Sequence, residues 1–233
     1  MPLLLDAEGW DAVRLSLLVA GNSVAIGLPP AAMTGWLLAR TRFPGRALLD
    51  ALAHLPLVLP PVVIGWMLLV VLGLRGPVGA WLDAWFGIRL AFTREGAAIA
   101  TAVMSFPLIV RAVRLSLEGA DPGLEAAART LGAGPLDRFV TVTVPMMAPG
   151  LLAGAVTAFA ASLGEFGAVI TFVSNIPGET QTLPLAIYSA TQSPGGEAQA
   201  ARFAGVSFIL AVSGLLLAEV LARHMRRALG RAG

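Results

Sequence analysis

Five long apolar runs, separated by segments that carry arginine, are the feature that most constrains this chain. The runs cover residues 12–38, 51–73, 95–113, 147–173 and 204–222. About 20 apolar residues in a helix cross the hydrocarbon core of a bilayer, where a spanning segment must satisfy its own backbone hydrogen bonds. Hydrophobic residues make up 57% of the chain and charged residues only 13%, which excludes an ordinary soluble domain. The sequence therefore predicts an all-α polytopic membrane protein with about five transmembrane helices.

The distribution of charge predicts the orientation of the chain. Three parts are expected: an extracytoplasmic arm at 1–11, one transmembrane domain at 12–222 and a cytoplasmic basic tail at 223–233. The arm has no basic residue, so no cleaved signal peptide is predicted. Link 39–50 holds three arginines and the tail four, and arginine favours the cytoplasmic side. Residues 121–145 are therefore predicted to be cytoplasmic, whereas 74–94 and 174–203 are predicted to be outer loops without a membrane-spanning helix.

Several kinds of chemistry are excluded by residue type. The chain has no Cys, and all 16 of its basic residues are Arg. A Walker A loop needs a Lys to reach the phosphates of ATP, so the chain is predicted not to hydrolyse ATP itself. His54 and His224 lie far apart in the sequence and have no partner at ligand spacing. No catalytic residue, metal site or bound cofactor is therefore predicted.

Segment 121–145 carries polar residues between two very apolar runs. Asp121 and Pro122 are typical of a helix start, and Gly132 is typical of a helix end in the left-handed conformation. Two apolar faces follow helical spacing, the first made by Leu124, Ala127, Ala128 and Leu131 and the second by Leu136, Phe139 and Val140. The pattern predicts two short helices at an angle, with Glu125 as a charged anchor, that seat in a groove of another protein. An ordinary connector between membrane helices is the alternative.

The second and fourth apolar runs contain residues that interrupt or tighten a membrane helix. Pro60 and Pro61 lie at membrane depth and free backbone groups that protein or water must satisfy, so the second helix is predicted to be broken. In the fourth run a small residue recurs at every fourth position, the spacing that lets helices approach closely. This stripe consists of Gly150, Gly154, Ala158 and Ser162.

Glu165 is the one acidic residue well inside a predicted span. It lies between Gly164 and Gly167, which permit close packing or a local break. An ionisable residue inside the membrane is a functional hypothesis by default. Two roles of Glu165 stay open. One is structural hydrogen bonding or gating, and the other is direct lining of a translocation pathway.

Segment 121–145 resembles the cytoplasmic EAA loop of type I ABC importer permeases. The match consists of Glu125, Ala127, Ala128, Gly132, Val142, Val144 and Pro145. Ala126 is interposed after the Glu, a variant that resembles the molybdate and sulfate branch of the family. Stretches 54–63, 104–112, 162–168 and 177–184 are also similar to that branch, although relatives often have Arg where this chain has Ala161.

The resemblance implies a function for each part of the chain. The chain would be the membrane subunit of an importer in the bacterial cytoplasmic (inner) membrane, where two copies form the pathway for an oxyanion. Molybdate is the first expectation, with sulfate or tungstate as alternatives. Residues implied in docking are Glu125, Ala127, Ala128, Arg129, Gly132, Phe139 and Pro145. Residues implied in translocation or gating are Pro60, Pro61, Ser162, Gly164, Glu165 and Gly167.

The implied partners are a second permease, two ABC ATPase subunits, a periplasmic oxyanion-binding protein and the lipid bilayer, with no nucleic acid. ATP and Mg²⁺ would be used by the ATPase subunits. Two other classes remain alternatives. An ion-gradient secondary transporter predicts a relay of ionisable residues inside the membrane, for which the chain offers only Glu165. An intramembrane enzyme predicts clustered His, Asp or Ser at catalytic spacing, which the sequence does not contain.

Overall fold

The structure, a computed structural model, describes residues 5–121 and 123–229, and within the last helix the side chains of 215, 217–219 and 221–229 are not described. The described part is helical. The helices are α1 (Ala7–Arg40), α2 (Arg46–Val58), α3 (Pro61–Leu72), α4 (Pro77–Phe86), α5 (Arg94–Glu118), α6 (Gly123–Thr130), α7 (Pro135–Arg138), α8 (Val144–Leu163), α9 (Gly167–Val173), α10 (Leu183–Gln192) and α11 (Glu197–Leu229). A π-helical turn, Phe139–Thr143, joins α7 to α8.

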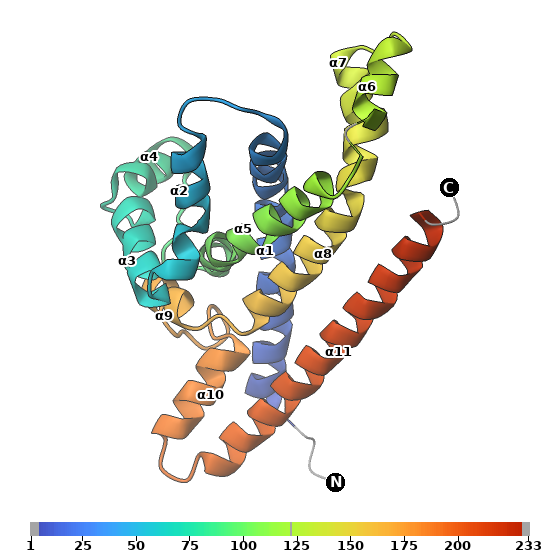
Figure 1. The fold of residues 1–233 in the computed structure, drawn as a ribbon. Helices are drawn as coiled ribbons and strands as arrows, with labels where there is room; N and C mark the ends of the chain where they lie inside the picture. The colour runs from blue at the N-terminus through green and yellow to red at the C-terminus, as the bar shows by residue number, and fades with distance from the viewer. Residues whose placement is uncertain (1–4, 122, 230–233) are drawn as a thin grey trace.

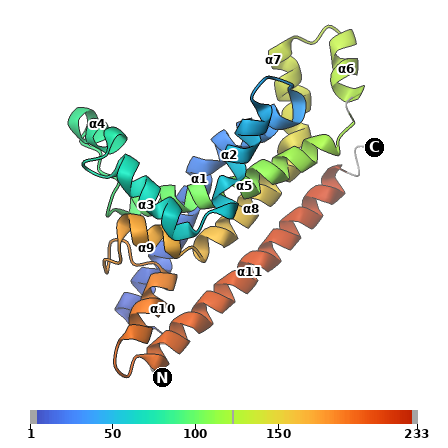
Figure 2. The ribbon, with the colours of Figure 1, turned by 60° about the vertical axis from the view of Figure 1, so that its left-hand side comes forward.

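The helices are arranged so that two ends of the molecule differ. Helices α6 and α7 project from one end, and the turn between α10 and α11 lies at the opposite end together with the start of α1 (Figures 1 and 2). Helix α1 begins at Ala7, where the Asp6 carboxylate accepts a hydrogen bond of 2.8 Å from Gly9 N–H. It continues without interruption through Pro29 and Pro30 to Arg40. One long helix therefore connects the two ends.

The centre of the fold is formed by α1, α5 and α8. The four small residues predicted as a close-packing stripe, Gly150, Gly154, Ala158 and Ser162, are all buried on α8. A Cβ on Gly150 would lie 2.5 Å from the carbonyl oxygen of Ala112, and one on Gly154 would lie 3.0 Å from Ile109 Cα. The backbones of α8 and α5 are thus in close contact along this stripe, as the spacing of small residues predicted. Ser162 also shares a buried hydrogen bond of 3.0 Å with Ser23 of α1.

The apolar interior is built mainly around α5. Ile109, Val110 and Val113 are fully buried against α1 and α8, and Ala97 and Ala100 pack against α9. Helix α5 buries residues on most of its circumference, as expected of a helix surrounded by other helices. It therefore forms the support on which α1, α8 and the shorter helices are placed.

The break predicted in the second apolar run is present. Helix α2 ends at Val58, α3 begins at Pro61, and the two helices are bent by 115°. Pro60 precedes α3 and Pro61 occupies its first turn, where a missing N–H leaves no intrahelical bond unmade. The two prolines therefore start a new helix in a different direction.

Three single helices are long and apolar enough to cross a membrane by themselves. They are Ala7–Arg40, Arg94–Glu118 and the helical stretch Pro135–Leu163, and the bent pair α2–α3 makes a fourth candidate if it acts as one span. These are the candidate spans among residues 5–121 and 123–229. The predicted fifth run, 204–222, lies within α11, whose side chains are described in part. The number of spans remains a prediction.

Four expected segments differ from the observed helices. Segment 74–94 was expected to be a loop without a membrane-spanning helix, and it contains α4, which has 10 residues and is too short to span a bilayer. Segment 147–173 is divided between α8 and α9, because Gly164 ends the first helix and the Glu165 carboxylate caps the second. Segment 174–203 contains α10 and the start of α11, and arm 1–11 contains the first turn of α1. The Glu165 carboxylate supplies the cap of α9, whereas α4 and α10 each begin with a proline in the first turn, a position that proline favours.

Candidate functional site

The projecting end of the molecule consists of α6, α7 and the turn between them (Figure 2). Gly132 has φ +84°, so the predicted left-handed helix end is present. Its neighbour Ala133 donates a 3.0 Å hydrogen bond to the carbonyl of Ala128, which closes α6. At the other end of α6 the Asp121 carboxylate accepts a 2.8 Å hydrogen bond from Gly123 N–H. Pro122, the predicted first helical residue, lies outside the described residues.

Apolar side chains at the tip of this projection face solvent. Leu131 is 87% exposed and Leu136 is 77% exposed, although both lie on faces that the sequence pattern marked as apolar. Leu124 and Val140 are also more than half exposed. Within the described chain these four residues, here called the tip leucine patch, each stay more than half exposed. The loop thus presents an apolar surface of the kind that a partner covers.

Glu125 is directed toward its own chain rather than outward. Its Oε1 lies 3.3 Å from Nε of Arg40, at the end of α1, and accepts a 3.1 Å hydrogen bond from the Thr143 hydroxyl. The Arg40 side chain is 17% exposed and that of Glu125 27%, so the pair is only partly screened by water. The predicted charged anchor thus connects α6 to α1 and to the π-helical turn.

The other predicted docking residues divide into two groups. Ala127, Arg129 and Gly132 are exposed, whereas Ala128 is half-buried. Phe139 turns inward, and its ring meets Trp36 of α1 edge-on with centroids 5.4 Å apart. Pro145 lies at the point where the π-helical turn passes into α8. Phe139 therefore holds the base of the loop in place rather than forming its outer surface.

Two helix breaks form a second cluster of predicted residues. A Cβ on Gly167, the first residue of α9, would lie 2.8 Å from Cβ of Pro61, the first residue of α3. A Cβ on Gly65 would lie 2.6 Å from the carbonyl oxygen of Ala168. Both glycines are needed because the two broken helices touch at these points. Pro61 of one break and Gly167 of the other are thus in contact, which no local sequence pattern indicated.

Glu165 lies in the break between α8 and α9. Its Oε1 accepts a 2.9 Å hydrogen bond from Ala168 N–H, one of the free donors at the start of α9. Gly164 caps the end of α8 and is exposed. Ser162 is 6% exposed and is engaged with Ser23, so it is directed into the helix packing. The geometry thus gives Glu165 a helix-capping contact and Ser162 an interhelical one.

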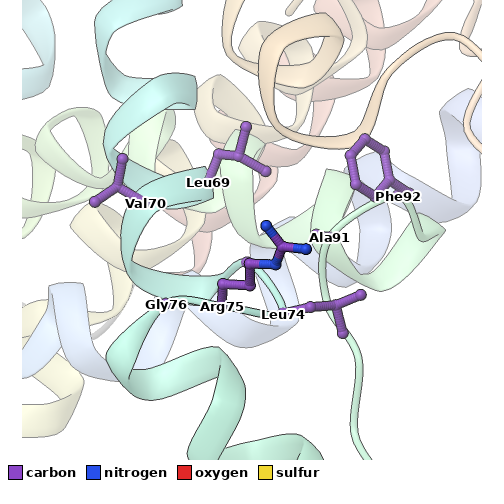
Figure 3. A pocket seen from close by; sticks show the side chains of 8 residues that line it. Leu69, Val70, Leu74, Arg75, Gly76, Ala91 and Phe92 are labelled. Carbon is purple, nitrogen blue, oxygen red and sulfur yellow. The ribbon is translucent and has the colours of Figure 1, made fainter.

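A separate hollow of about 350 Å³ lies where α3 turns into α4. It is lined by apolar groups of Leu69, Val70, Leu74, Ala91 and Phe92, and among the described residues Arg75 is its only charged lining residue (Figure 3). Phe92 has φ +63°, an unusual conformation for an aromatic residue. None of the predicted site residues lines this hollow, which lies away from the α6–α7 projection (Figure 2).

Three residues that contact the loop were not singled out from the sequence. Trp36 and Arg40 come from the end of α1, and Thr143 comes from the π-helical turn. Arg40 was counted only as a positive charge on the cytoplasmic side. No local signal connects it to Glu125, because the contact depends on how α1 passes the base of the loop.

A three-helix centre, two broken helices and a projecting two-helix loop define a membrane transport subunit. The chain belongs to the family described as binding-protein-dependent transport system inner membrane component, whose model matches residues 31–227. It is therefore a multi-pass inner-membrane protein, the permease subunit of an ABC importer.

Individual relatives make the family assignment more specific. The chain is 57% identical over 229 residues to the molybdenum transport system permease protein ModB of Escherichia coli K12, covering 98% of this chain and 100% of that protein. It is 42% identical over 204 residues to the sulfate transport system permease protein CysT of the same strain, covering 85% of this chain and 71% of that protein. The fold is also similar to a crystal structure of a bacterial alginate ABC transporter in complex with an alginate pentasaccharide-bound periplasmic protein. The TM-score is 0.72 at 18% sequence identity, covering 97% of this chain and 81% of that chain. This last likeness concerns the fold.

Proposed function

We propose that this chain is the permease subunit of an ATP-driven importer and that two copies form the translocation pathway for molybdate. The 57% identity to a molybdenum permease over nearly the whole chain is the observation that carries the choice of substrate. A sulfate permease is related at 42% identity, so sulfate is the second candidate. Selection between the two would rest with the periplasmic binding protein that delivers the anion.

The α6–α7 loop is proposed to dock one ABC ATPase subunit on each permease. The tip leucine patch supports this role, because exposed leucines at the end of a projecting loop favour a protein partner. Leu131 and Leu136 are its most exposed members. Ala127, Arg129 and Gly132 would lie at the docking surface, while Glu125, Ala128, Phe139 and Pro145 would hold the loop in position. ATP and Mg²⁺ would bind to the ATPase.

The contact between the two helix breaks is proposed to take part in gating. Pro60 and Pro61 start α3, and Gly164, Glu165 and Gly167 form the break before α9. A relative movement of α3 and α9 would change the contact at Gly167 without unfolding a continuous helix. Ser162 would fix α8 to α1 while this movement occurs.

A reconstituted transporter tests the proposal. The chain is combined in proteoliposomes with its ATPase and its binding protein, and uptake of labelled molybdate is followed with and without ATP. The proposal requires ATP-dependent uptake of molybdate that unlabelled sulfate suppresses only weakly. Strong suppression by sulfate at equal concentration would favour the second candidate, and uptake driven by an ion gradient without ATP would overturn the function.

Substitutions at the tip test the docking role separately. Leu131→Asp with Leu136→Asp places charge on the proposed docking surface, so ATPase co-purification is expected to fall at least about tenfold. Ala198→Asp is the matched control, because Ala198 is an exposed residue in the first turn of α11 at the opposite end of the molecule. Full co-purification of the ATPase with the double variant would show that the loop is only a connector.

A further inference from the structure

Three arginine side chains surround a small pocket at the base of the α6–α7 projection. The pocket has a volume of about 250 Å³ and lies between the end of α1, α6 and the segment from α7 into the π-helical turn. Arg40, Arg129 and Arg138 line it, and Glu125 is the one acidic residue among its described lining residues. Three guanidinium groups against one carboxylate leave the walls with a net charge of +2 at neutral pH.

Several hydrogen-bond donors in this pocket have no acceptor. Nε and Nη2 of Arg40 and Nε of Arg138 are buried and make no hydrogen bond within the described residues. Arg40 Nε lies 3.3 Å from Glu125 Oε1, so the two charges attract, but the geometry of a hydrogen bond is not met. The same carboxylate oxygen already accepts from Thr143. Buried donors without an acceptor are costly, so the pocket favours an acceptor supplied from outside the chain.

The shape and charge of these donors indicate the class of ligand. A guanidinium group presents its N–H donors in a planar fork that matches the oxygens of phosphate-like groups, and it stays charged at all physiological pH values. We propose that the pocket binds a tetrahedral oxyanion group. Two sources supply the same chemistry, a free ion such as phosphate, sulfate or molybdate, and the phosphate of an anionic lipid headgroup.

The position of the pocket gives such a ligand a mechanical consequence. Arg40 belongs to α1, whereas Arg138 belongs to α7 and Arg129 to α6. An oxyanion bound by both Arg40 and Arg138 would connect α1 to α7 independently of the Arg40–Glu125 contact. It would hold the loop against α1 and offset the repulsion among the three arginines. The α6–α7 projection lies away from α3 and α9 (Figures 1 and 2), so the site is distinct from the proposed gating region.

Trp36 lines the pocket and serves as a fluorescent reporter. The chain has five tryptophans, and the other four, Trp10, Trp66, Trp81 and Trp85, are exposed and can be replaced by Phe. The purified single-tryptophan protein in uncharged detergent is titrated with phosphate, sulfate and molybdate, with chloride at matched ionic strength as reference. In a second arm the protein is placed in nanodiscs of phosphatidylcholine with or without phosphatidylglycerol.

A saturable change in Trp36 fluorescence with the free ions would support a free oxyanion, and a change seen only with phosphatidylglycerol would support a lipid phosphate. In either case Arg138→Gln and Arg129→Gln are expected to weaken binding by about tenfold or more. Arg42→Gln is the matched control, because Arg42 is exposed, lies two residues after Arg40 and does not line the pocket.

Absence of any response in both arms, or an equal response in all three Arg variants, would overturn the proposal. Arg129 is exposed, so its replacement leaves the packing of the loop intact and guards against a result caused by misfolding. The measurement involves neither the ATPase nor uptake. Its failure would therefore leave the proposed transport function standing.

Discussion

Glu125 Oε1 lies 3.3 Å from Arg40 Nε, so the acidic residue of the projecting loop is paired with the end of the first helix of its own chain. The same oxygen accepts from Thr143, which places three elements around one carboxylate. A displacement of the loop would therefore act on α1 through this contact. Helix α1 packs against α5 and α8 along the centre of the fold. The pair is therefore a direct physical connection between the proposed docking surface and the transmembrane helices.

Separation of this pair is expected to destabilise the loop. Glu125→Gln keeps an acceptor for Thr143 but leaves the partly buried Arg40 charge without its counter-charge, at a cost of about 1–3 kcal/mol. The double variant with Arg40→Gln removes both charges, whereas each single variant leaves one charge unpaired. Its loss of stability should therefore be smaller than the sum of the two single losses. Thermal unfolding in detergent of the four proteins gives the coupling energy. Strict additivity would show that the two side chains do not interact.

Gly132 and Gly134 form a matched pair for the geometry of the loop. A Cβ would meet no atom within 4 Å at either position, but Gly132 has φ +84° and Gly134 has φ −67°. Valine is strained only at positive φ, so Gly132→Val is expected to cost about 1–2 kcal/mol and to tilt α6, whereas Gly134→Val should be nearly neutral. ATPase co-purification and ATP-dependent uptake measure the effect. Equal behaviour of the two variants would contradict the role of the turn.

Close packing of α8 on α5 can be tested with two helical glycines. Gly150→Ala would place Cβ 2.5 Å from the Ala112 carbonyl oxygen and is expected to destabilise the protein by about 1–3 kcal/mol. Gly21→Ala is the control, because a Cβ there meets nothing within 4 Å. Its higher helix propensity should stabilise the protein by up to about 1 kcal/mol. Opposite shifts in the melting temperature are therefore predicted, and a melting temperature unchanged by Gly150→Ala would refute the packing argument.

Glu165 is predicted to act first through the cap of α9. Glu165→Gln retains a side-chain oxygen that can accept from Ala168 N–H, so uptake should fall only modestly. Glu165→Leu leaves that donor unpaired, at about 1–3 kcal/mol, and uptake should fall strongly. Uptake and melting temperature are measured on both variants in the same vesicles or detergent. Wild-type behaviour of the Leu variant would refute the capping role, and equal loss in both variants would favour a need for the charge itself.

The predicted orientation can be tested because the chain has no Cys. Glu8→Cys introduces a thiol in the exposed first turn of α1, and Asp137→Cys introduces one on the exposed side of α7. The two positions lie at opposite ends of the molecule (Figure 1). In intact cells a membrane-impermeant thiol reagent should label the Glu8→Cys variant and should not label the Asp137→Cys variant. The reverse pattern would invert the topology, with the loop outside the cytoplasm.

Much of this protein follows from local sequence pattern. Apolar runs long enough to cross a bilayer determine the helical membrane class, because lipid leaves no other way to satisfy the backbone. Pro60 and Pro61 predict the break before α3, the spacing from Gly150 to Ser162 predicts the close approach of α8, and Gly132 predicts the left-handed turn. Each of these depends on the conformational limits of one residue or on one helix period, which the sequence contains in full.

Contacts between distant segments were decided only by the tertiary structure. Arg40 meets Glu125, Trp36 meets Phe139, and Pro61 meets Gly167 because helices that are far apart in the chain pass the same point. Sequence pattern also treated 147–173 as one run, whereas the Glu165 carboxylate caps a separate α9. Hydrophobicity determines which segments leave water, but it is non-directional, so only the packing of complete helices selects which side chains face one another.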